Sequence, residues 1–253
     1  MCGTLKFVGV IPTRYASSRF PGKPLADICG KPMIWWTYQN AVSAAGLSQL
    51  YVATDDKRIE SKCRELGIQV IMTSCKHTTG VERLAEVALE ITADYYILIQ
   101  GDEPLLEPES ITNMIQLVSL QSVNNKKPCV YTYKTRIYSP VDAVNSTIIK
   151  VVTDLHDTVL FASRSPIPYP QSATTFDYYK SVGVYAYPYQ ILKGFHLLPK
   201  GPLDTIENHD FMRLLENQIP IKAFNYDTET ISVDTEKDLV RVKTIITQRG
   251  DRK

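Results

Sequence analysis

A cluster of cations and hydroxyls follows the first apolar segment of the chain. The apolar segment spans 7–11, and the loop after it, 12–25, begins where a buried strand would end. A triphosphate needs hydrogen-bond donors from several directions, namely backbone N–H, hydroxyl, guanidinium and ammonium groups. The loop therefore suits a nucleoside triphosphate, and the alternative is a solvated loop that binds nothing. Its donor side chains include Arg14, Ser17, Ser18, Arg19 and Lys23.

Two common nucleotide-binding motifs are absent from the sequence. Gly22-Lys23 is followed by Pro24, and the residue five positions before Gly22 is Ser17 rather than glycine, so this loop is not a Walker motif. No G-x-G-x-x-G fingerprint occurs anywhere in the chain. P-loop and dinucleotide-binding folds are therefore disfavoured.

Acidic residues stand at the end of another apolar segment. The run Tyr95–Ile99 leads directly into 100–104, which read Gln-Gly-Asp-Glu-Pro. Mg²⁺ prefers oxygen ligands and is usually shared between carboxylates and phosphates, so Asp102 is a candidate ligand. Gly101 would let the backbone turn sharply beside a ligand. The alternative is a turn whose acids are solvated.

A second acidic segment lies near the end of the chain, where 233–239 read Val-Asp-Thr-Glu-Lys-Asp-Leu. Asp234 or Thr235 could simply cap the last helix. The functional interpretation makes Asp234 a second magnesium ligand that reaches Asp102, because metal ions held there would stabilise the oxygens of a phosphoryl-type transfer.

Two further segments are candidates for ligand binding. His77–Arg83 lies between a strand-like and a helical segment, so a helix N-terminus would offer free N–H groups. The structural alternative, which can coexist, is a capping box of Thr79 and Glu82. Further along, Arg164 is a candidate partner for a substrate carboxylate. The tyrosines of 183–187 fit packing better than binding.

Alternating strand-like and helix-like segments would bring these loops together. In the first half of the chain, helical stripes such as Ile34, Tyr38 and Ala41 separate apolar runs such as 50–53 and 69–72. Helices between short apolar strands imply a mostly parallel sheet that is covered on both faces. Because ligands bind beyond the carboxyl ends of such strands, the loops after the first, third and fourth strands should meet.

The second half of the chain has a different pattern of residues. From about Pro128, short β-branched or aromatic runs alternate with proline-rich turns, which indicates a strand-rich insertion. The chain then returns to a predicted helix over Glu207–Glu216, a strand over Ile221–Asn225 and a last helix from Thr235.

The composition is that of an ordinary globular protein, with 44% hydrophobic residues, 22% charged residues and a net charge of +1. There is no long basic block to support binding of nucleic acid or a membrane surface. No apolar stretch approaches the roughly 18 residues of a membrane span. Five scattered cysteines without a C-x-x-C pair argue against a disulfide scaffold and a zinc site. With no signal-peptide pattern, the predicted location is a reducing cytoplasm.

Covalent catalysis has no visible basis, because no Ser-His-Asp order or thiol motif emerges. The remaining chemistry is positioning plus charge neutralisation by metal and cations. Two other functional classes, a glycosyltransferase and a binding protein without activity, fit the sequence less well. A glycosyltransferase that uses sugar nucleotides would be expected to carry Asp-x-Asp, where this chain has Asp-Glu-Pro at 102–104. A binding protein without activity would have no need of both Asp102 and Asp234.

These segments occur together and in order in the CMP-Kdo synthetases (3-deoxy-manno-octulosonate cytidylyltransferases), and the chain resembles that family over residues 6–245. In that family CTP and Kdo, an eight-carbon 2-keto acid sugar, give CMP-Kdo and pyrophosphate for lipopolysaccharide or capsule synthesis. The matching stretches are Ile11–Leu25, Gly30–Ile34, Ala53–Asp56, Met72–Ser74, Gly80–Val87, Gln100–Leu105, Lys150–Val152, Ser163–Tyr169, Gly183–Tyr187 and Val233–Leu239.

The resemblance implies an α/β fold of the nucleotide-diphospho-sugar-transferase type, which is Rossmann-like, with a mostly parallel sheet, helices on both faces and a smaller strand-rich insertion. It also implies a cytoplasmic, Mg²⁺-dependent homodimer. The expected organisation is a CTP-binding portion (1–128), an acceptor-binding and dimerisation portion (129–200) and a C-terminal portion that completes the single domain (201–253).

The resemblance also implies roles for individual residues. The triphosphate would be held by Arg14, Ser17 and Lys23, with Arg19 nearby. The cytidine and ribose side would be lined by Thr73, Ser74, Arg83 and Gln100. Magnesium would be held by Asp102 and Asp234, which together with Lys23 and Arg14 form the expected catalytic set. The anomeric hydroxyl would attack the α-phosphorus in line, and sugar-side positions fall at Arg164 and Tyr185.

The departures from the family lie mostly on the sugar side. Ser181 stands where the family usually has a histidine, two residues before a glycine. The family's Leu-Glu-Gln-Leu-Arg segment reads His-Asp-Phe-Met-Arg at 209–213, so the acid is shortened to Asp210 and the amide is replaced by Phe211. Replacing the histidine and the amide removes hydrogen bonds to the sugar. This affects the choice of acceptor, because a pocket that hydrogen-bonds substrate hydroxyls discriminates strongly between substrates. The main hypothesis is cytidylyl transfer to Kdo. The alternative is the same chemistry on a modified Kdo such as 8-amino-Kdo, another keto-acid sugar or a phosphonate.

Overall fold

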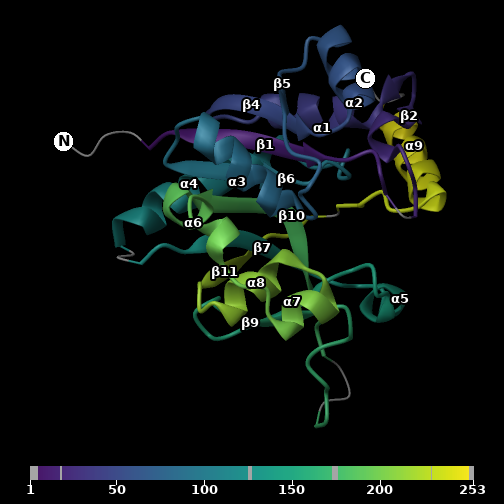
Figure 1. Cartoon of the computed structure of the whole chain (residues 1–253). Helices are drawn as coiled ribbons and strands as arrows, with labels where there is room; N and C mark the ends of the chain where they lie inside the picture. Colours follow the sequence, from purple (N-terminus) through teal and green to yellow (C-terminus); the bar gives the residue numbers. More distant parts are fainter. Residues whose placement is uncertain (1–4, 18, 125–126, 173–175, 229, 251–253) are drawn as a thin grey trace.

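A mixed sheet runs through the molecule, with helices against both of its faces (Figure 1). The computed structural model describes residues 5–17, 19–124, 127–172, 176–228 and 230–250. Along its main path the strand order is β11-β7-β10-β6-β1-β4-β5. These strands are β1 (Phe7–Thr13), β4 (Leu47–Thr54), β5 (Val70–Met72), β6 (Tyr95–Ile99), β7 (Val130–Arg136), β10 (Tyr179–Pro188) and β11 (Ile221–Asn225).

The first half of the chain forms the parallel part of this sheet. β1 pairs in parallel with β4 and β6, and β4 pairs in parallel with β5. β10 is antiparallel to both β6 and β7, whereas β11 is parallel to β7. A short antiparallel pair, β8 (Lys150–Thr153) with β9 (Val159–Ser163), joins the sheet through β10. The prediction of a mostly parallel sheet with helices on both faces is confirmed.

Side chains alternate between the two faces of the sheet, as the two-residue period of a strand requires. In β1, Val8 and Val10 pack in the core cluster that contains α3 (Gly80–Glu90), while Phe7 and Ile11 point to the opposite face. The opposite face is covered by α1 (Met33–Val42), α2 (Lys57–Glu65) and α4 (Pro108–Asn124).

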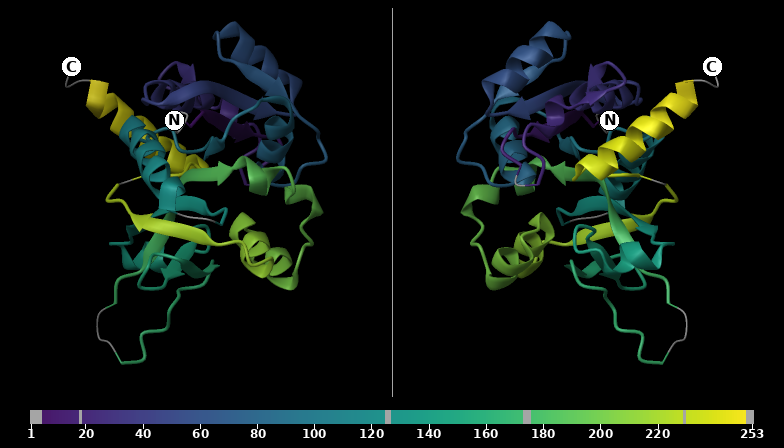
Figure 2. Two further views of the ribbon diagram at one scale, coloured as in Figure 1. Left: turned by 90° about the vertical axis from the view of Figure 1, so that its left-hand side faces the viewer. Right: turned by 90° about the vertical axis from the view of Figure 1, so that its right-hand side faces the viewer.

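The C-terminal segment packs against the N-terminal part of the chain. α9 (Glu236–Gly250) runs along the outer edge of the molecule in both views of Figure 2. Its Val242 shares a small core cluster with Val233, Ile28 and Met33, next to the hairpin of β2 (Asp27–Ile28) and β3 (Lys31–Pro32). This packing brings the segment before α9 to the loop that follows β1.

Several helices differ from the sequence prediction. α4 was not predicted, although its buried residues Ile111, Met114 and Val118 have helical spacing. The helix predicted over 207–216 is observed as α8 (Asp210–Glu216), with a later start. The three residues before it are not part of α8, because a separate helix, α7 (Pro202–Glu207), ends at Asn208, which adopts the left-handed conformation (φ 48°).

Smaller elements complete the description. They are α5 (Pro140–Val144) and α6 (Tyr189–Leu192), with 3₁₀ turns at Lys23–Leu25 and Phe195–Leu197. Cys29, Cys63, Cys75 and Cys129 are free thiols. Among the described helices, none has both the length and the apolar character needed to cross a bilayer.

Candidate active site

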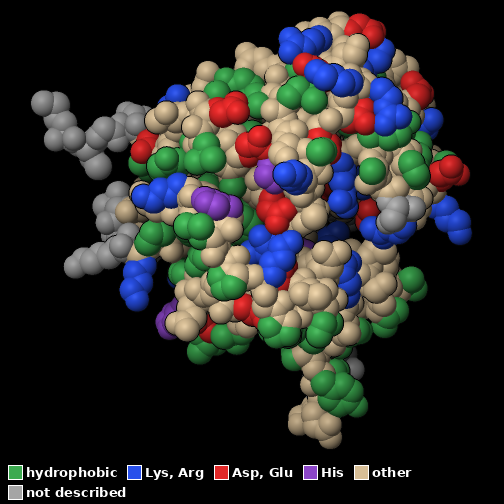
Figure 3. All heavy atoms as spheres, viewed as in Figure 1, with side chains coloured by type: hydrophobic (Ala, Val, Ile, Leu, Met, Phe, Trp, Pro, Cys, Tyr) green, Lys and Arg blue, Asp and Glu red, His purple; other side chains and the backbone are tan. Residues whose placement is uncertain are grey.

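A cleft of about 520 Å³ lies beyond the carboxyl ends of β1 and β6 and faces α8 across the opening. Lys and Arg side chains surround the hollow in the middle of the face shown in Figure 3. The cleft joins the loops after β1, β5 and β6, which confirms that three sheet-edge loops meet. Its polar lining includes Arg14, Ser17, Arg19, Lys23, His77, Thr78, Thr79, Arg83, Gln100, Asp102, Arg164, Asn208, His209, Asp210 and Asp234.

Lys23 ties together the two acids that the sequence analysis singled out. Its Nζ donates to Oδ2 of Asp102 at 2.6 Å and to Oδ1 of Asp234 at 3.2 Å, and it also donates to the carbonyl of Val233 at 3.0 Å. Arg19 reaches the same Asp234 oxygen at 3.0 Å. Burial disfavours the ammonium, but the two carboxylates outweigh burial and raise the pKa of Lys23 above its ordinary value.

The backbone around Lys23 explains how the loop folds back to this point. Gly22 adopts φ 73°, which favours glycine, and a Cβ at this position would lie 2.9 Å from the ring of Tyr15. Its N–H donates to the carbonyl of Tyr15 at 2.8 Å, which closes the loop before the turn at Lys23–Leu25. Ser18 lies outside the described residues.

The donor set at this point suits Mg²⁺. Asp102 and Asp234 direct carboxylate oxygens to one position, and the backbone N–H of Val233 donates to the Asp102 carbonyl at 2.8 Å, which holds the two loops together. No cluster of three or more His, Cys, Asp or Glu is found among the described residues. Two carboxylates are enough for Mg²⁺, which completes its shell with waters and substrate phosphates.

A buried carboxyl supports the loop after β6. Glu103 is 5% exposed, accepts from the Ser232 hydroxyl at 3.2 Å, and its Oε2 has no partner among the described residues. Burial raises the pKa of Glu103 to about 7, and the charge of Asp102 acts in the same direction. A Cβ on Gly183 would come within 2.3 Å of this carboxyl. Glycine is therefore required at 183 for Glu103 to fit beside β10.

The residues expected on the cytidine side fall into two groups. Arg83 and Gln100 line the cleft. Thr73 lies behind Arg83 and is hydrogen-bonded to its guanidinium, which also pairs with Asp55 at 3.4 Å. Burial lowers the pKa of Arg83 below its ordinary value. Ser74 donates its backbone N–H to a Glu86 carboxylate at 2.9 Å, outside the cleft lining.

Both helix-capping alternatives correspond to observed contacts. Thr79 and Glu82 form a capping box at the start of α3. At the start of α9, Thr235 and Asp238 cap each other, with the Asp238 N–H 3.4 Å from the Thr235 hydroxyl. Asp234 is therefore not needed as the cap, and its carboxylate stays with Lys23 and Arg19.

Glu82 also connects the two sides of the cleft. Its Oε2 accepts from the backbone N–H of Thr78 at 2.7 Å, and its Oε1 accepts from Nη1 of Arg213 in α8 at 3.0 Å. Arg213 is 3% exposed, and its Nε donates to Asp204 of α7 at 2.8 Å. This buried network fixes α7 and α8 against the N-terminus of α3.

Arg164 presents a guanidinium to the cleft. Its Nε donates to the carbonyl of Glu207 at 3.0 Å, and its Nη1 donates to the carbonyl of Ser146 at 2.9 Å. The Glu207 carboxylate accepts from the backbone N–H of Arg164 at 3.0 Å and from the Ser163 hydroxyl at 2.5 Å. The charge of the Glu207 carboxylate interacts with the guanidinium, but the two groups form no salt bridge within the described ranges, so the guanidinium can still pair with a substrate anion.

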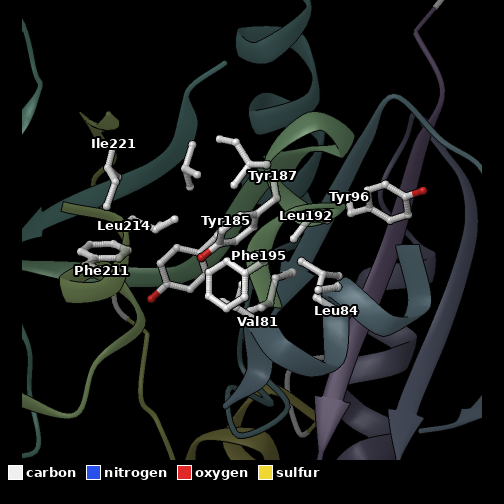
Figure 4. Close-up of a cluster of buried hydrophobic side chains, with 14 of the residues drawn as sticks. Val81, Leu84, Tyr96, Tyr185, Tyr187, Leu192, Phe195, Phe211, Leu214 and Ile221 are labelled. Atoms are coloured by element: carbon white, nitrogen blue, oxygen red, sulfur yellow. The ribbon is translucent and has the colours of Figure 1, made fainter. Parts of the chain in front are cut away.

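Three residues expected at the acceptor lie behind the cleft rather than in its lining. Tyr185 is 7% exposed and Phe211 is 1% exposed, and their rings meet edge to face at 5.7 Å (Figure 4). The Ser181 hydroxyl lies 2.9 Å from that of Tyr185. Phe211 belongs to the large core cluster because an aromatic ring at this position is drawn into the apolar interior, where an amide would need partners.

Three residues of the cleft lining, Met33, Asn208 and His209, are not predicted from their sequence context. Asn208 and His209 reach the cleft only because α7 ends before α8 begins. The pair Asn208-His209 could have indicated a helix end in the sequence, because asparagine tolerates the left-handed conformation and both residues disfavour a helix interior.

Comparisons with known proteins agree with this geometry. The cytidylyltransferase family profile matches residues 8–231. The 3-deoxy-manno-octulosonate cytidylyltransferase of Escherichia coli is 38% identical over 243 residues, covering 96% of this chain and 97% of that protein. The protein of the same name from Geobacter metallireducens is 40% identical over 250 residues, covering 94% of this chain and 96% of that protein.

Solved structures extend the comparison to three dimensions. A cytidylyltransferase from Leptospira borgpetersenii, 16% identical, has a TM-score of 0.63, covers 96% of this chain and 87% of that chain, and shares the fold. A structure of CMP:2-keto-3-deoxy-manno-octonic acid synthetase complexed with CTP has a TM-score of 0.89 at 39% identity and covers 96% of this chain and 99% of that one. With sequence and structure matched over nearly the whole length, the chain belongs to the 3-deoxy-manno-octulosonate cytidylyltransferases.

Proposed function

We propose that this protein transfers a cytidylyl group from CTP to Kdo, forming CMP-Kdo and pyrophosphate. The observation that carries the proposal is the convergence of Lys23, Asp102 and Asp234 at the mouth of a cation-lined cleft. This arrangement suits a triphosphate that reacts at phosphorus, and the relatives named above are Kdo cytidylyltransferases.

The nucleotide half of the cleft comprises the loops after β1, β5 and β6. Arg14 and Ser17 line it, and Arg14 is oriented by a 3.2 Å bond from Nη1 to the carbonyl of Thr78. The N-terminus of α3 offers a positive dipole end to an anion. Arg83 and Gln100 form the wall where the cytidine side is expected.

Asp102 and Asp234 are the proposed magnesium ligands. Bound there, Mg²⁺ would neutralise charge on the phosphates and raise the electrophilicity of the α-phosphorus. Lys23 holds the two carboxylates at one position, and its raised pKa keeps it cationic at neutral pH. Its ammonium can therefore also stabilise charge that develops on departing pyrophosphate.

The acceptor half lies between β9 and the break separating α7 from α8. Arg164 would pair with the carboxylate of the keto acid and orient the sugar. The anomeric hydroxyl then forms a bond to the α-phosphorus and loses its proton, while the bond to the β-phosphate breaks and pyrophosphate leaves. Catalysis in this scheme rests on position and charge, without a covalent enzyme intermediate.

Several broader expectations accompany this proposal. We infer a cytoplasmic homodimer that acts in lipopolysaccharide or capsule synthesis. Described parts of the segment between β9 and β10 project away from the body (Figure 2). This segment exposes Tyr169 and Phe176, 82% and 42% accessible, which suits burial against a second copy. The expected portions 1–128, 129–200 and 201–253 remain a prediction.

Pyrophosphate release tests the proposal. Purified protein is incubated with CTP, UTP or ATP, each with Kdo or other keto-acid sugars and phosphonates. We expect release from CTP with Kdo and Mg²⁺, and its loss when EDTA removes the metal. A different acid is the less favoured alternative, since the named relatives act on Kdo. Release with another acid and none with Kdo would contradict the proposal.

A further inference from the structure

His209 occupies the position in the acceptor half where α7 gives way to α8. It is the N-cap of α8, with φ −142° and ψ 133°, and follows Asn208 in its left-handed conformation. Its side chain lines the cleft together with Arg164 and Asp210.

The hydrogen bonds of the ring determine which nitrogen carries the proton. Nδ1 accepts from the backbone N–H of Phe211 at 3.3 Å, so in the neutral ring the proton resides on Nε2. Burial lowers the pKa of His209 to about 4, and the charge of Arg164 acts in the same direction. At neutral pH the ring is therefore an uncharged donor. Nε2 has no hydrogen-bond partner among the described residues.

The ring is held by the same residues that depart from the family pattern. His209 meets Phe211 edge to face at 4.7 Å, and Phe211 meets Tyr185 in the same manner at 5.7 Å. Tyr185 is hydrogen-bonded to Ser181. Ser181, Tyr185 and Phe211 thus form a buried support behind the ring. The imidazole of His209 lies at the outer end of this support and faces the cleft.

We propose that His209 is an acceptor-binding residue whose Nε2–H donates a hydrogen bond to an oxygen of the acid beside Arg164. This inference deepens the proposed function and rests on it. Ser181 does not line the cleft, and the Phe211 ring has no hydrogen-bond donor. His209 supplies a donor to the acceptor half from α8, so its loss should weaken binding of the acid and leave CTP binding unchanged.

Substitutions at 209 separate this contact from the role of the ring as a helix cap. His209→Asn keeps an acceptor near the place of Nδ1 and removes Nε2–H. His209→Gln can carry an amide N–H to the place of Nε2 but loses the cap. His209→Leu removes both groups. His196→Leu, at an exposed histidine, is the matched control.

Steady-state pyrophosphate release is measured with varied Kdo and with varied CTP. Because one net hydrogen bond is lost, we expect the KM for Kdo to rise about 10-fold in His209→Asn and His209→Leu. We expect His209→Gln to stay within threefold of wild type, and the KM for CTP to stay within twofold in all variants. The melting temperature of His209→Asn should match wild type.

Two results would overturn the inference while the proposed function stands. One is an unchanged KM for Kdo in His209→Asn, which would leave only the cap. The other is an equal rise in all three variants, which would show a structural effect. A wild-type protein that releases no pyrophosphate from CTP and Kdo would overturn the proposed function and this inference with it.

Discussion

The two halves of the cleft are built in different ways. In the nucleotide half, charged side chains follow the ends of neighbouring parallel strands, and Lys23 and Arg19 together balance the charges of Asp102 and Asp234. In the acceptor half, Arg164 and His209 come from a strand end and a helix break, and aromatic rings support one of them. Sheet topology thus positions the first half, and tertiary packing positions the second.

This difference suggests where the reaction and where the choice of acceptor reside. A site placed by parallel strands changes little when surface residues change, because the strand ends are fixed by the core. A site placed by packing between β9, α7 and α8 can be altered by one or two substitutions. Substitutions in the two halves should therefore have separable kinetic effects.

The largest expected effect is at the proposed magnesium ligands. Asp102→Asn and Asp234→Asn each remove one carboxylate of the pair and should lower kcat about 10³-fold or more, which corresponds to about 4 kcal/mol. The measurement is pyrophosphate release over a Mg²⁺ titration. Asp27→Asn, at an exposed acid, is the control. A near-normal rate in either variant would remove that residue from the metal site.

The next effect is confined to the acceptor half. Arg164→Lys keeps the charge but loses the planar fork that suits a carboxylate, so the KM for Kdo should rise about 10- to 100-fold. The KM for CTP should stay within twofold. Arg58→Lys, at an exposed arginine, provides the comparison. Equal increases in both KM values would mean that the two halves do not act separately.

A smaller effect is expected in the nucleotide half, where the KM for CTP should rise and the KM for Kdo should not. Arg14 is exposed, and within the described ranges its side chain makes one hydrogen bond, to the Thr78 carbonyl, so Arg14→Ala should leave the fold intact. We expect the KM for CTP to rise about 10-fold, as for a lost charge-assisted hydrogen bond. The KM for Kdo should change little, and Lys57→Ala serves as the surface control. A selective rise for Kdo would reverse the assignment of the halves.

The smallest effect concerns the connection between the halves. Burial disfavours the Glu82 carboxylate, but hydrogen bonds from Thr78 and Arg213 outweigh it and lower its pKa from 4.5 to about 2. A carboxyl whose folded pKa is lowered adds stability above its unfolded pKa, and this stability is lost as pH falls toward the folded pKa.

Melting temperatures of wild type and Glu82→Gln test this connection. Wild type should melt higher than the variant above pH 4.5, and the difference should shrink as the pH falls toward 2. Glu65→Gln, at an exposed acid, controls for general charge effects. A difference that does not depend on pH would mean that the Glu82 charge is not what holds α8 to α3.

The sequence predicted the parallel half of the fold well because its signals are local. β6 is observed at Tyr95–Ile99, as expected. Each strand is a short apolar run, and its following loop carries the chemistry. The proximity of the loops containing Lys23 and Asp102 then follows from parallel pairing alone.

The acceptor half could not be predicted in the same way. Nothing local shows that Phe211 is drawn into the core or that His209 lines the cleft. These placements depend on how α8 packs against β9 and β10, which are distant in sequence. The predicted helix ran through Asn208 although 207–210 are all polar, and the left-handed residue there is what brings His209 to the cleft.

The most direct test is ³¹P NMR of wild-type protein with CTP, Kdo and Mg²⁺. The account predicts that the CTP resonances are replaced by pyrophosphate and one phosphodiester signal in equal amounts, with the phosphodiester carrying both CMP and Kdo by mass spectrometry. Unchanged CTP, or CTP that is hydrolysed without attachment to Kdo, would contradict it.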